Sequence, residues 1–492
     1  MSEHERHARA ERLRALREAG VDAYPAHLDP VERIAALRER YDLLEAEALE
    51  ASPPQVAVAG RVMAIRSFGK LVFVTLREDG AEIQASARQA ELGAAAFEQV
   101  RGLDVGDFVR VAGPLWRTRT RELTVAARRV DLLAKSLRPL PEKWHGLQDV
   151  EARFRQRYLD VLVNEDVRRA VLRRSRAVTA MRSFLDGRGF LEVETPVLQA
   201  LYGGASARPF VTRYEVYGQD VFLRISDELY LKRLVIGGLE RVYEIGRDFR
   251  NEGLSRKHNP EFTMMECYQA FADYRDMMEL VQALLQHVVR EVTGAARVVY
   301  RGQEIEFGGS WPRLRMTETI REATGVDVLA AREVGALRAA VRKAGLDPGS
   351  AATWGGVVDE LFSEHVEPKL VQPTFLVDYP VELSPLAKGT PDDPLLVERF
   401  ELFVAGMEIG NAFSELNDPE VQRARFEEQR RARAAGDEDA QPLDEDFLVA
   451  LEHGMPPTGG LGVGVDRLVM VLTDAAHIRE VLLFPYMRAE TS

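Results

Sequence analysis

The spacing of apolar residues changes abruptly at residue 56, from the period of helices to the period of strands. Upstream, apolar side chains recur at helical intervals among many charges, and Pro53 and Pro54 end that pattern. Downstream, five short β-rich runs follow one another as far as residue 125, with glycines between them. We therefore predict a helical extension over residues 1–50 and a small barrel of five strands over residues 51–135.

The barrel segment is basic although the chain as a whole is acidic. The net charge of −13 by itself disfavours a nucleic-acid partner. Residues 55–135 nevertheless hold 13 Lys and Arg against 9 Asp and Glu, a local balance of +4. Short glycine-separated strands with a basic excess fit an OB-fold, which commonly binds single-stranded nucleic acid. A solvated sheet face would carry the same modest excess, so the charge alone leaves both interpretations open.

The rest of the chain is predicted to be one larger α+β domain. A proline-stiffened linker over residues 136–150 precedes it, and the domain spans residues 151–492. Its strand-like runs are far apart with helices between them, which is typical of an antiparallel sheet flanked by helices. Neither a P-loop nor a G-x-G-x-x-G that follows a strand and opens a helix occurs in the sequence, which disfavours Walker and Rossmann nucleotide sites. Residues 301–370 are expected to form a partly helical insertion.

Cysteine content and hydropathy constrain the compartment. Cys267 is the one cysteine in the sequence, which excludes a disulfide within the chain and a zinc site built on cysteines. The first residues are charged, and no apolar run reaches the length of a membrane span. We expect a soluble, cytoplasmic protein with no membrane partner.

Two distant segments carry the groups that a nucleoside triphosphate site requires. Asp248–Gly253 places an arginine and acids on a short strand, and a loop containing Lys257 and His258 leads to the aromatic Phe262. Much later, Gly460–Arg467 alternates glycines with apolar residues and ends on an arginine. Fixed cations bind phosphate oxygens and an aromatic face stacks on a base, so the two segments together indicate a nucleotide clamp. Either segment alone would equally be a solvated hairpin or a glycine turn before a buried strand.

Together these segments resemble motifs 2 and 3 of the class II aminoacyl-tRNA synthetases, and Gly189–Pro196 resembles motif 1. Gly203–Phe210, Glu228–Arg233 and Glu408–Asp418 are similar to the bacterial-type lysyl-tRNA synthetases. The resemblance extends over nearly the whole chain. It implies an enzyme that activates L-lysine with ATP to lysyl-adenylate and pyrophosphate, and then transfers lysine to the 3′ end of tRNA(Lys). It also implies a homodimer with Pro196 at the two-fold interface.

The resemblance assigns residues to ATP and to a metal ion. Arg250 would lie between the α-phosphate and the lysine carboxylate, and Arg467 would hold the γ-phosphate end against the adenine face opposite Phe262. Glu401 and Glu408 match carboxylates that bind Mg²⁺, although their spacing of seven would place them on opposite faces of a regular strand and so requires a bend, bulge or turn. The residues that match ATP contacts are Arg250, Glu252, Lys257, His258, Phe262, Glu401 and Arg467.

The resemblance also assigns a lysine pocket. A lysine ammonium removed from water needs carboxylate partners. Glu228 would lie near the α-amino group, Tyr268 and Glu415 near the ε-amine, and Asn411 near the carboxylate. Each residue alone has an ordinary interpretation as a surface acid or a packed ring. The full set that matches lysine contacts is Gly203, Glu228, Arg250, Glu266, Tyr268, Asn411, Phe413 and Glu415.

In the barrel, Phe73 matches an aromatic that stacks on the tRNA anticodon in the family. Its neighbours Val72 and Val74 are apolar, and alternation alone does not reveal which face is solvated, so a core position for Phe73 is the alternative. The residues that match neighbouring anticodon contacts are Arg61, Arg66, Gln84 and Glu122.

Three positions depart from the family pattern. Lys257 stands where arginine is common, which puts a bidentate phosphate contact in question. Arg121 replaces a turn glycine, so the hairpin before Glu122 is expected to have another turn type. Ile65 replaces a frequent arginine and would weaken one anticodon contact.

Three other functions share part of this pattern. A sister synthetase for aspartate or asparagine has the same barrel and motifs, but an acidic pocket for a long cation disfavours it. A ligase that attaches lysine-type groups to another protein would not need the barrel. A non-catalytic RNA-binding protein would keep the barrel and lose the arginine and glutamate constellation, which is complete here.

Overall fold

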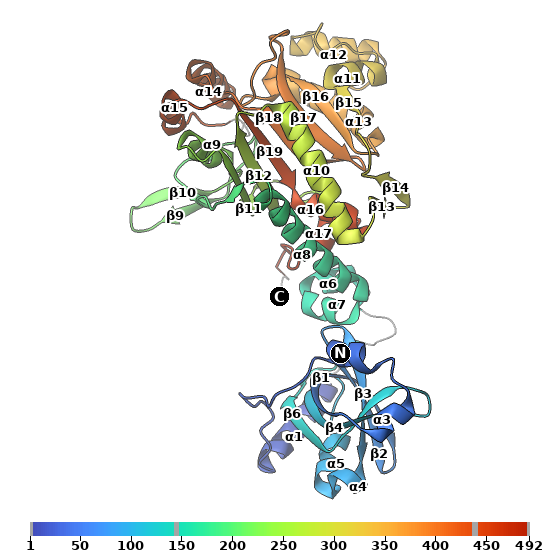
Figure 1. Ribbon diagram of the computed structural model, residues 1–492. Coiled ribbons are helices and arrows are strands. Elements are labelled where there is room, and N and C mark those ends of the chain that lie inside the picture. The colour runs from blue at the N-terminus through green and yellow to red at the C-terminus, as the bar shows by residue number, and fades with distance from the viewer. Residues whose placement is uncertain (1–2, 142–146, 435–440, 490–492) are drawn as a thin grey trace. The chain divides into compact units, whose positions relative to one another are not determined.

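The computed structural model describes residues 3–141, 147–434 and 441–489, and the chain divides into two compact units, Met1–Leu147 and Gln148–Ser492 (Figure 1). Each unit has a hydrophobic core of its own. Within the described ranges, no helix combines the length and the apolar character that a membrane crossing requires.

The first unit is a closed β-barrel. Its strand order is β1-β2-β3-β5-β4-β6, and β1 also pairs with β4, so the sheet closes on itself. Alternation along β2 directs Val72, Val74 and Leu76 into the core. The predicted strands are present, and β6 is a sixth that the apolar pattern did not reveal. The strands are β1 (Gln55–Phe68), β2 (Leu71–Glu78), β3 (Ala81–Arg88), β4 (Phe108–Arg117), β5 (Leu123–Ala126) and β6 (Arg129–Ala134).

The N-terminal helices belong to the barrel unit. Ile34 and Leu37 on one helix and Leu49 on the next are buried in the same apolar cluster as the barrel strands, with exposed fractions of 0%, 0% and 1%. The helices of this unit are α1 (Glu3–Glu18), α2 (Ile34–Tyr41), α3 (Ala46–Ala51), α4 (Gln89–Leu92) and α5 (Ala94–Arg101).

The second unit is built on an eight-stranded sheet in the order β15-β16-β17-β18-β19-β12-β11-β7. Neighbouring strands are antiparallel except at the two edges, where β15 with β16 and β7 with β11 are parallel. The predicted α+β class is therefore confirmed. The strands are β7 (Leu191–Glu192), β11 (Arg241–Phe249), β12 (Glu261–Ala270), β15 (Arg313–Arg315), β16 (Thr374–Pro380), β17 (Leu396–Val404), β18 (Met407–Ser414) and β19 (Thr458–Gly464).

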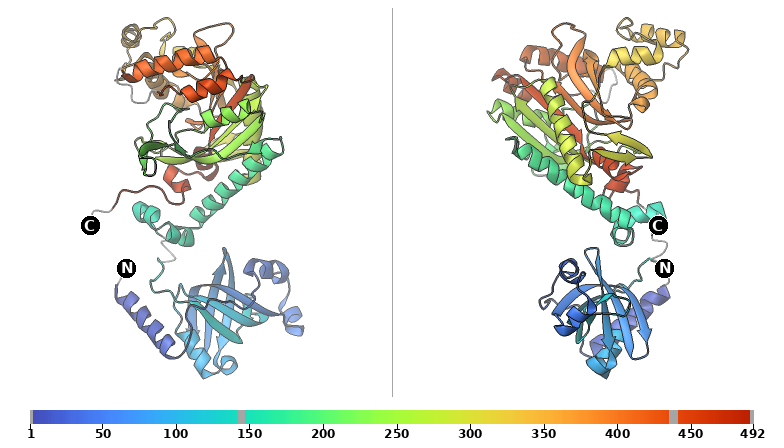
Figure 2. Two further views of the ribbon diagram at one scale, coloured as in Figure 1. Left: turned by 90° about the vertical axis from the view of Figure 1, so that its left-hand side faces the viewer. Right: turned by 45° about the vertical axis from the view of Figure 1, so that its right-hand side comes forward.

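Smaller sheets and the helices complete this unit (Figure 2). The small sheets consist of β8 (Leu198–Gln199), β9 (Val211–Tyr214) and β10 (Gln219–Leu223), and of β13 (Arg297–Tyr300) and β14 (Gln303–Glu306). The helices are α6 (Val150–Arg155), α7 (Arg157–Val163), α8 (Glu165–Asp186), α9 (Glu228–Ile236), α10 (Tyr274–Thr293), α11 (Met316–Thr324), α12 (Val334–Lys343), α13 (Trp354–His365), η1 (Glu367–Lys369), η2 (Val381–Leu383), α14 (Pro419–Ala434), α15 (Glu445–Glu452), α16 (Val465–Thr473) and α17 (Ile478–Val481).

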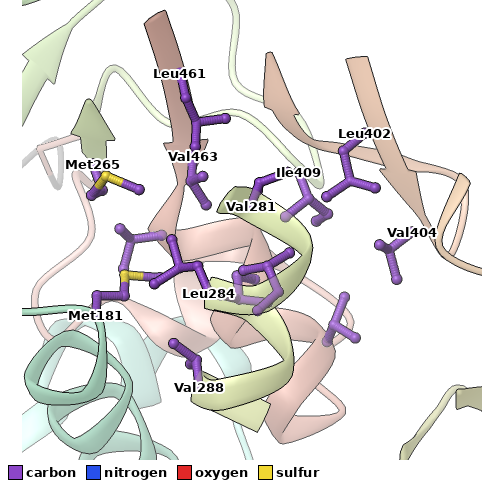
Figure 3. Packing of buried hydrophobic residues seen from close by; sticks show 14 of the residues in the cluster. Met181, Met265, Val281, Leu284, Val288, Leu402, Val404, Ile409, Leu461 and Val463 are labelled. Atoms are coloured by element: carbon purple, nitrogen blue, oxygen red, sulfur yellow. The ribbon is translucent and has the colours of Figure 1, made fainter. Parts of the chain in front are cut away.

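The main core lies where α8, α10 and α16 pack on one face of the large sheet. Helix α10 begins at a capping box made by Asp273 and Asp276 and ends at Gly294, whose φ of +76° is favourable for glycine. Its apolar side, including Val281 and Leu284, packs against strands β17, β18 and β19 (Figure 3). The covered face is therefore dry, and the opposite face is available for a site.

Strand alternation separates these two faces. On β12, Met265 and Cys267 enter the core while Glu266 and Tyr268 point the other way. On β19, Leu461 and Val463 enter the core, whereas the alternating residues on the opposite face are glycines. Because these glycines have no side chains, the centre of that face stays open.

Candidate active site

A cavity of about 770 Å³ lies over the glycine-bearing face of the large sheet. Of the described residues around it, Gly204, with a φ of +87°, lines the cavity, whereas the predicted Gly203 does not. The sequence-predicted residues that line the cavity are Glu228, Arg250, Glu252, Lys257, His258, Phe262, Glu266, Tyr268, Glu401, Glu408, Asn411, Phe413, Glu415 and Arg467. The two distant motifs therefore meet in one place.

Arg467 is the centre of a polar group in this cavity. It lies in the first turn of α16, directly after β19. Its Nη1 donates to Glu408 Oε2 at 2.9 Å and to the Glu408 carbonyl at 2.8 Å, and its Nη2 lies 3.2 Å from His258 Nε2. Burial and the charge of Arg467 lower the pKa of His258 to about 4, so the imidazole is neutral near neutral pH. The guanidinium therefore supplies the positive charge of this group.

Arg250 lies against an aromatic wall. Its guanidinium carbon is 5.0 Å from the ring centroid of Phe262, within the range of a cation–π contact. Its Nε also donates to the carbonyl of Ile225 at 3.3 Å. The ammonium of Lys257, from the loop between β11 and β12, contacts the carboxylate of Glu367 in η1. The loop thus presents one arginine at Phe262 and directs its lysine toward residues 301–370.

Glu401 and Glu408 lie on adjacent strands, which explains their spacing. Glu401 is on β17 and Glu408 on β18, and the tip of this hairpin has positive φ values of 55° at Ala405 and 68° at Gly406. The register shifts between Leu402 and Phe403, which is a β-bulge. Both a turn and a bulge are therefore present, and together they bring the two carboxylates to one cavity.

Arg399 joins the carboxylates to the acidic end of the cavity. Its Nη2 donates to Glu401 Oε1 at 2.5 Å and its Nε to Asn411 Oδ1 at 2.9 Å. Burial raises the pKa of Glu401 to about 7, an effect that Arg399 opposes and that the charge of Glu408 reinforces. Burial acts on Glu408 too, but Arg467 keeps its pKa below the ordinary value. One of the two acids is thus ionised and the other is poised near neutral pH.

Buried carboxylates form the other end of the cavity. Glu228 begins α9 and Glu415 follows β18, and their exposed fractions are 4% and 1%. Between them lies Lys232 of the protein itself, with its Nζ 2.5 Å from Glu228 Oε1 and in contact with Glu415 Oε2. A Cβ atom at Gly460 would lie 1.9 Å from Glu415 Oε1, so only glycine leaves room for this carboxylate.

Glu266 extends the acidic end. Its Oε1 accepts from the Ser226 hydroxyl at 3.0 Å and its Oε2 from the Tyr268 hydroxyl at 3.1 Å. Burial, with the charges of Asp248 and Glu228, raises the pKa of Glu266 to about 8. This carboxyl therefore holds a proton near neutral pH in the folded chain.

On the barrel, Phe73 lies on the outer face, opposite the buried Val72 and Val74, and is half-buried. The Arg66 guanidinium carbon is 6.0 Å from its ring centroid, and Arg66 Nη2 donates to Gln84 Oε1 at 2.8 Å. The structure thus excludes the plain core position for Phe73 and groups it with two of the predicted contact residues.

The other two predicted barrel residues make their contacts elsewhere. Arg61 lies over Phe108, with 4.2 Å between the guanidinium carbon and the ring centroid, and Glu122 accepts from Arg38 Nη2 at 3.0 Å. Ile65 packs against the barrel core. Arg121 has a φ of +65°, the backbone region that glycine favours, so the hairpin accommodates arginine in a glycine-type conformation.

Sequence reasoning missed two cations of the cavity region, the partly buried Arg399 and the buried Lys232. Arg399 stands two residues before Glu401, so strand alternation would have placed both on one face. Lys232 stands four residues after Glu228, the helical spacing of neighbouring side chains. In both cases the signal was an opposite charge at the period of the local structure.

Comparisons with known proteins agree with this geometry. Residues 149–488 match the family "tRNA synthetases class II (D, K and N)", and residues 56–133 match the "OB-fold nucleic acid binding domain". The chain is 54% identical to a Lysine–tRNA ligase of Roseiflexus castenholzii over 98% of both chains. It is 52% identical to a Lysine–tRNA ligase of Chloroflexus aurantiacus over 98% of this chain and 97% of the relative. The chain belongs to the class II tRNA synthetases of the D, K and N group.

Proposed function

We propose that this protein is a lysine–tRNA ligase. It activates L-lysine with ATP to lysyl-adenylate, releases pyrophosphate, and transfers lysine to the 3′ end of tRNA(Lys). The observation that carries the proposal is the buried acidic end of the cavity, where the carboxylates of Glu228 and Glu415 lie beside the arginine-lined part, with Glu266 as a hydrogen-bonding neighbour. Within a family that includes aspartate and asparagine enzymes, buried acids favour the substrate with a cationic side chain.

ATP would bind in the part of the cavity that contains Arg250 and Arg467. Arg467, with the neutral His258 beside it, would hold the β- and γ-phosphates. Arg250 would lie between the α-phosphate and the lysine carboxylate, so that two anionic reactants approach one fixed cation. Phe262 offers a ring for the adenine, and Glu252 lines the same region. The protein's contribution is positioning and charge neutralisation rather than covalent catalysis.

Glu401 and Glu408 would hold Mg²⁺. The described residues contain no cluster of three or more His, Cys, Asp or Glu suited to a metal. A pair of carboxylates nevertheless fits Mg²⁺, which is usually bound through one or two carboxylates together with substrate phosphates. When bound, the ion would neutralise charge on the phosphate oxygens. Within the protein itself, Arg399 orients the carboxylate of Glu401 and Arg467 orients that of Glu408.

The lysine substrate would lie between Arg250 and Glu415. Glu228 would accept from its α-ammonium, Tyr268 and Glu415 from its ε-ammonium, and Asn411 would lie near its carboxylate. Phe413 and the backbone near Gly203 and Gly204 complete the walls. An aspartate side chain would bring a further negative charge into this acidic region, at a cost of several kcal/mol for a like-charge contact.

The barrel would bind the anticodon of tRNA(Lys). Phe73 with Arg66 and Gln84 forms the aromatic and polar group for this contact, and Arg61 and Glu122 would add further contacts from β1 and from the turn before β5. The family also implies a cytoplasmic homodimer. Pro196 is exposed beside Val197 and Leu198, whose exposed fractions of 40% and 56% leave an apolar strip for a partner copy.

The deciding experiment is ATP–pyrophosphate exchange with each amino acid supplied separately. We expect exchange with lysine alone among the standard amino acids, and loss of that exchange in a folded Arg250→Ala variant. Exchange driven by aspartate or asparagine would replace this proposal with the sister activity. Exchange that is undiminished in Arg250→Ala would remove the assigned chemistry.

A further inference from the structure

The acidic pocket already contains a cation that the reaction does not use. Lys232 is completely buried, with an exposed fraction of 0%, and lies on the same face of α9 as Glu228. Its Nζ is 2.5 Å from Glu228 Oε1 and contacts Glu415 Oε2. The same atom lies 5.6 Å and 5.9 Å from the ring centroids of Phe413 and Phe447. An ammonium is therefore held between the two carboxylates assigned to the two ends of the substrate.

The charges of this group leave room for one more cation. When both carboxylates are ionised, they and one ammonium have one negative charge in excess, and free lysine has a net charge of +1. Within the described ranges both oxygens of Glu415 lack a hydrogen-bond partner; Oε2 forms an ion pair with Lys232, which leaves Oε1. This oxygen is also the one for which Gly460 leaves space. A buried carboxylate oxygen without a partner indicates where a second ammonium would bind.

We propose that Lys232 is a positioning residue for lysine selection, which favours the anionic forms of Glu228 and Glu415 and holds both carboxylates in place before lysine binds. This inference rests on the proposed function, because it assumes that lysine occupies this pocket. Lys232 does not touch the reacting atoms. It sets the charge of the pocket, so that a substrate with net charge +1 completes the balance and a neutral or anionic amino acid does not.

The physical reason is the cost of two adjacent carboxylates in a dry pocket. Burial raises the pKa of both Glu228 and Glu415, and Lys232 is the principal group that opposes this rise in each. Without Lys232 the pair would hold a proton more strongly, and binding a lysine ammonium would then require that proton to leave. The other titratable or charged groups that face the pair are Glu266 and Tyr268 on β12 and Arg399 on β17.

The test compares the pH dependence of the KM for lysine in the parent and in three Lys232 variants. Lys232→Met and Lys232→Gln remove the charge, and Lys232→Arg retains it. In the neutral variants the KM for lysine should rise more steeply than in the parent as pH falls, by up to roughly ten-fold per pH unit if one proton must leave. Glu266, Tyr268 and Arg399 are the same in all four proteins, so the difference in slope isolates Lys232. In Lys232→Arg the KM for lysine should be raised at every pH by the larger side chain, with the slope of the parent.

A merely structural role for Lys232 would lower the stability of the protein without singling out the KM for lysine, whereas the proposal predicts a change in that KM alone. The KM for ATP and the kcat at saturating lysine should stay within about three-fold of the parent in the neutral variants, since the contacts of Lys232 are with Glu228, Glu415 and two aromatic rings and not with the residues assigned to ATP. Lys135→Met is the matched control, because it also removes a buried lysine from between two carboxylates, but in the barrel. It should lower the melting temperature and leave the KM for lysine and its pH slope unchanged.

The outcomes separate the two proposals. A folded neutral variant with the pH slope of the parent would overturn the role of Lys232 while leaving the lysine activity in place. Failure of both neutral variants to fold would also count against it, because Lys232 would then be a requirement of the fold itself. A parent protein without lysine-dependent exchange would remove the proposed function, and this inference with it.

Discussion

Two buried lysines, one in each unit, lie between pairs of carboxylates, and their surroundings differ. In the barrel, Lys135 Nζ is 2.6 Å from Asp104 Oδ2 and 2.7 Å from Asp107 Oδ2. In the second unit, Lys232 has the equivalent position between Glu228 and Glu415. Both lysine side chains are at most 1% exposed. The same three charges therefore occur twice.

In the barrel group the carboxylate oxygens are supplied with partners, and we call this group closed. In the other group one oxygen of Glu415 is left over among the described residues, and we call that group open. Asp107 Oδ1 accepts from the backbone of Ser136 at 2.8 Å, and its Oδ2 also accepts from the backbone of Asp104 at 2.8 Å. Arg12 contacts the second oxygen of Asp104, so additional cations complete the balance there. Although burial alone would raise it, Lys135 and Arg12 hold the pKa of Asp104 below its ordinary value.

At Glu415 one oxygen stays without a partner in the described chain, and burial raises the pKa of Glu415. Saturated partners indicate a structural ion group, whereas an unsatisfied oxygen indicates a binding site.

The largest expected effect comes from breaking each group at its carboxylate. Glu415→Gln removes the charge assigned to the substrate ε-ammonium, and breaking a buried pair in this way costs about 3 to 5 kcal/mol. That is roughly two to three and a half decades in kcat/KM for lysine, with the KM for ATP little changed. Asp107→Asn should instead lower the melting temperature and leave the KM for lysine unchanged. If Glu415→Gln and Asp107→Asn changed kcat/KM for lysine equally, the two groups would not differ in function.

The second prediction concerns the division of work between the units. Phe73→Ala should raise the KM for tRNA by the loss of about 1 to 3 kcal/mol of base stacking, and leave lysine activation unchanged. Phe97→Ala is the matched control, because Phe97 is 2% exposed in the barrel core, so its truncation should lower stability. Steady-state aminoacylation and thermal unfolding distinguish the two. A melting temperature that falls equally in both variants would make Phe73 a packing residue.

The sequence predicted the elements more completely than the contacts between them. Alternation and glycine turns revealed the barrel strands except β6, whose burial pattern is irregular because it pairs only with β4 at an edge. The paired motifs revealed the residues of the cavity, but those roles came from the family resemblance. Each of Arg399 and Lys232 had a local signal, an opposite charge at the period of its strand or helix, but the second contact of each comes from a separate segment: Asn411 for Arg399 and Glu415 for Lys232. Whether Phe73 faces solvent or the core likewise depends on how the barrel closes.

The third prediction uses pH to separate the units. Burial raises the pKa of Asp227 to about 10 and that of Glu266 to about 8 in the second unit. The folded chain retains protons that the unfolded chain loses above about pH 4, so stability falls as pH rises toward the folded values. The lowered pKa values of His258 and His477 act oppositely, but only below about pH 6.5. Between about pH 6.5 and pH 8 the second unit should lose on the order of 1 kcal/mol per pH unit.

The barrel should not follow this trend. The lowered pKa of Asp104 contributes stability that is fully present above about pH 4, so no loss is expected in the same range. Labelling of the buried Cys267 in urea reports unfolding of the second unit. Ala85→Cys in a Cys267→Ser background is the equivalent reporter in the barrel core, where Ala85 is 3% exposed. Urea midpoints that shift in parallel for the two reporters would show that the buried acids do not control stability separately.

The smallest expected effect concerns the backbone conformation of Arg121 in a turn of the barrel, and whether it costs stability. Arg121 has a φ of +65°, a conformation that costs a non-glycine residue about 1 to 2 kcal/mol, whereas glycine adopts it freely at an entropic cost of about 0.5 to 1 kcal/mol. Arg121→Gly should therefore stabilise the barrel by about 0.5 kcal/mol, measured with the barrel reporter. Its exposed ion pair with Glu45, at 3.8 Å, contributes little to this balance. Arg119→Gly is the control, because Arg119 lies in the same turn, carries the same charge and lacks a positive φ, so the change there should destabilise. Shifts of the same sign in both variants would mean that lost charge, and not backbone conformation, governs this hairpin.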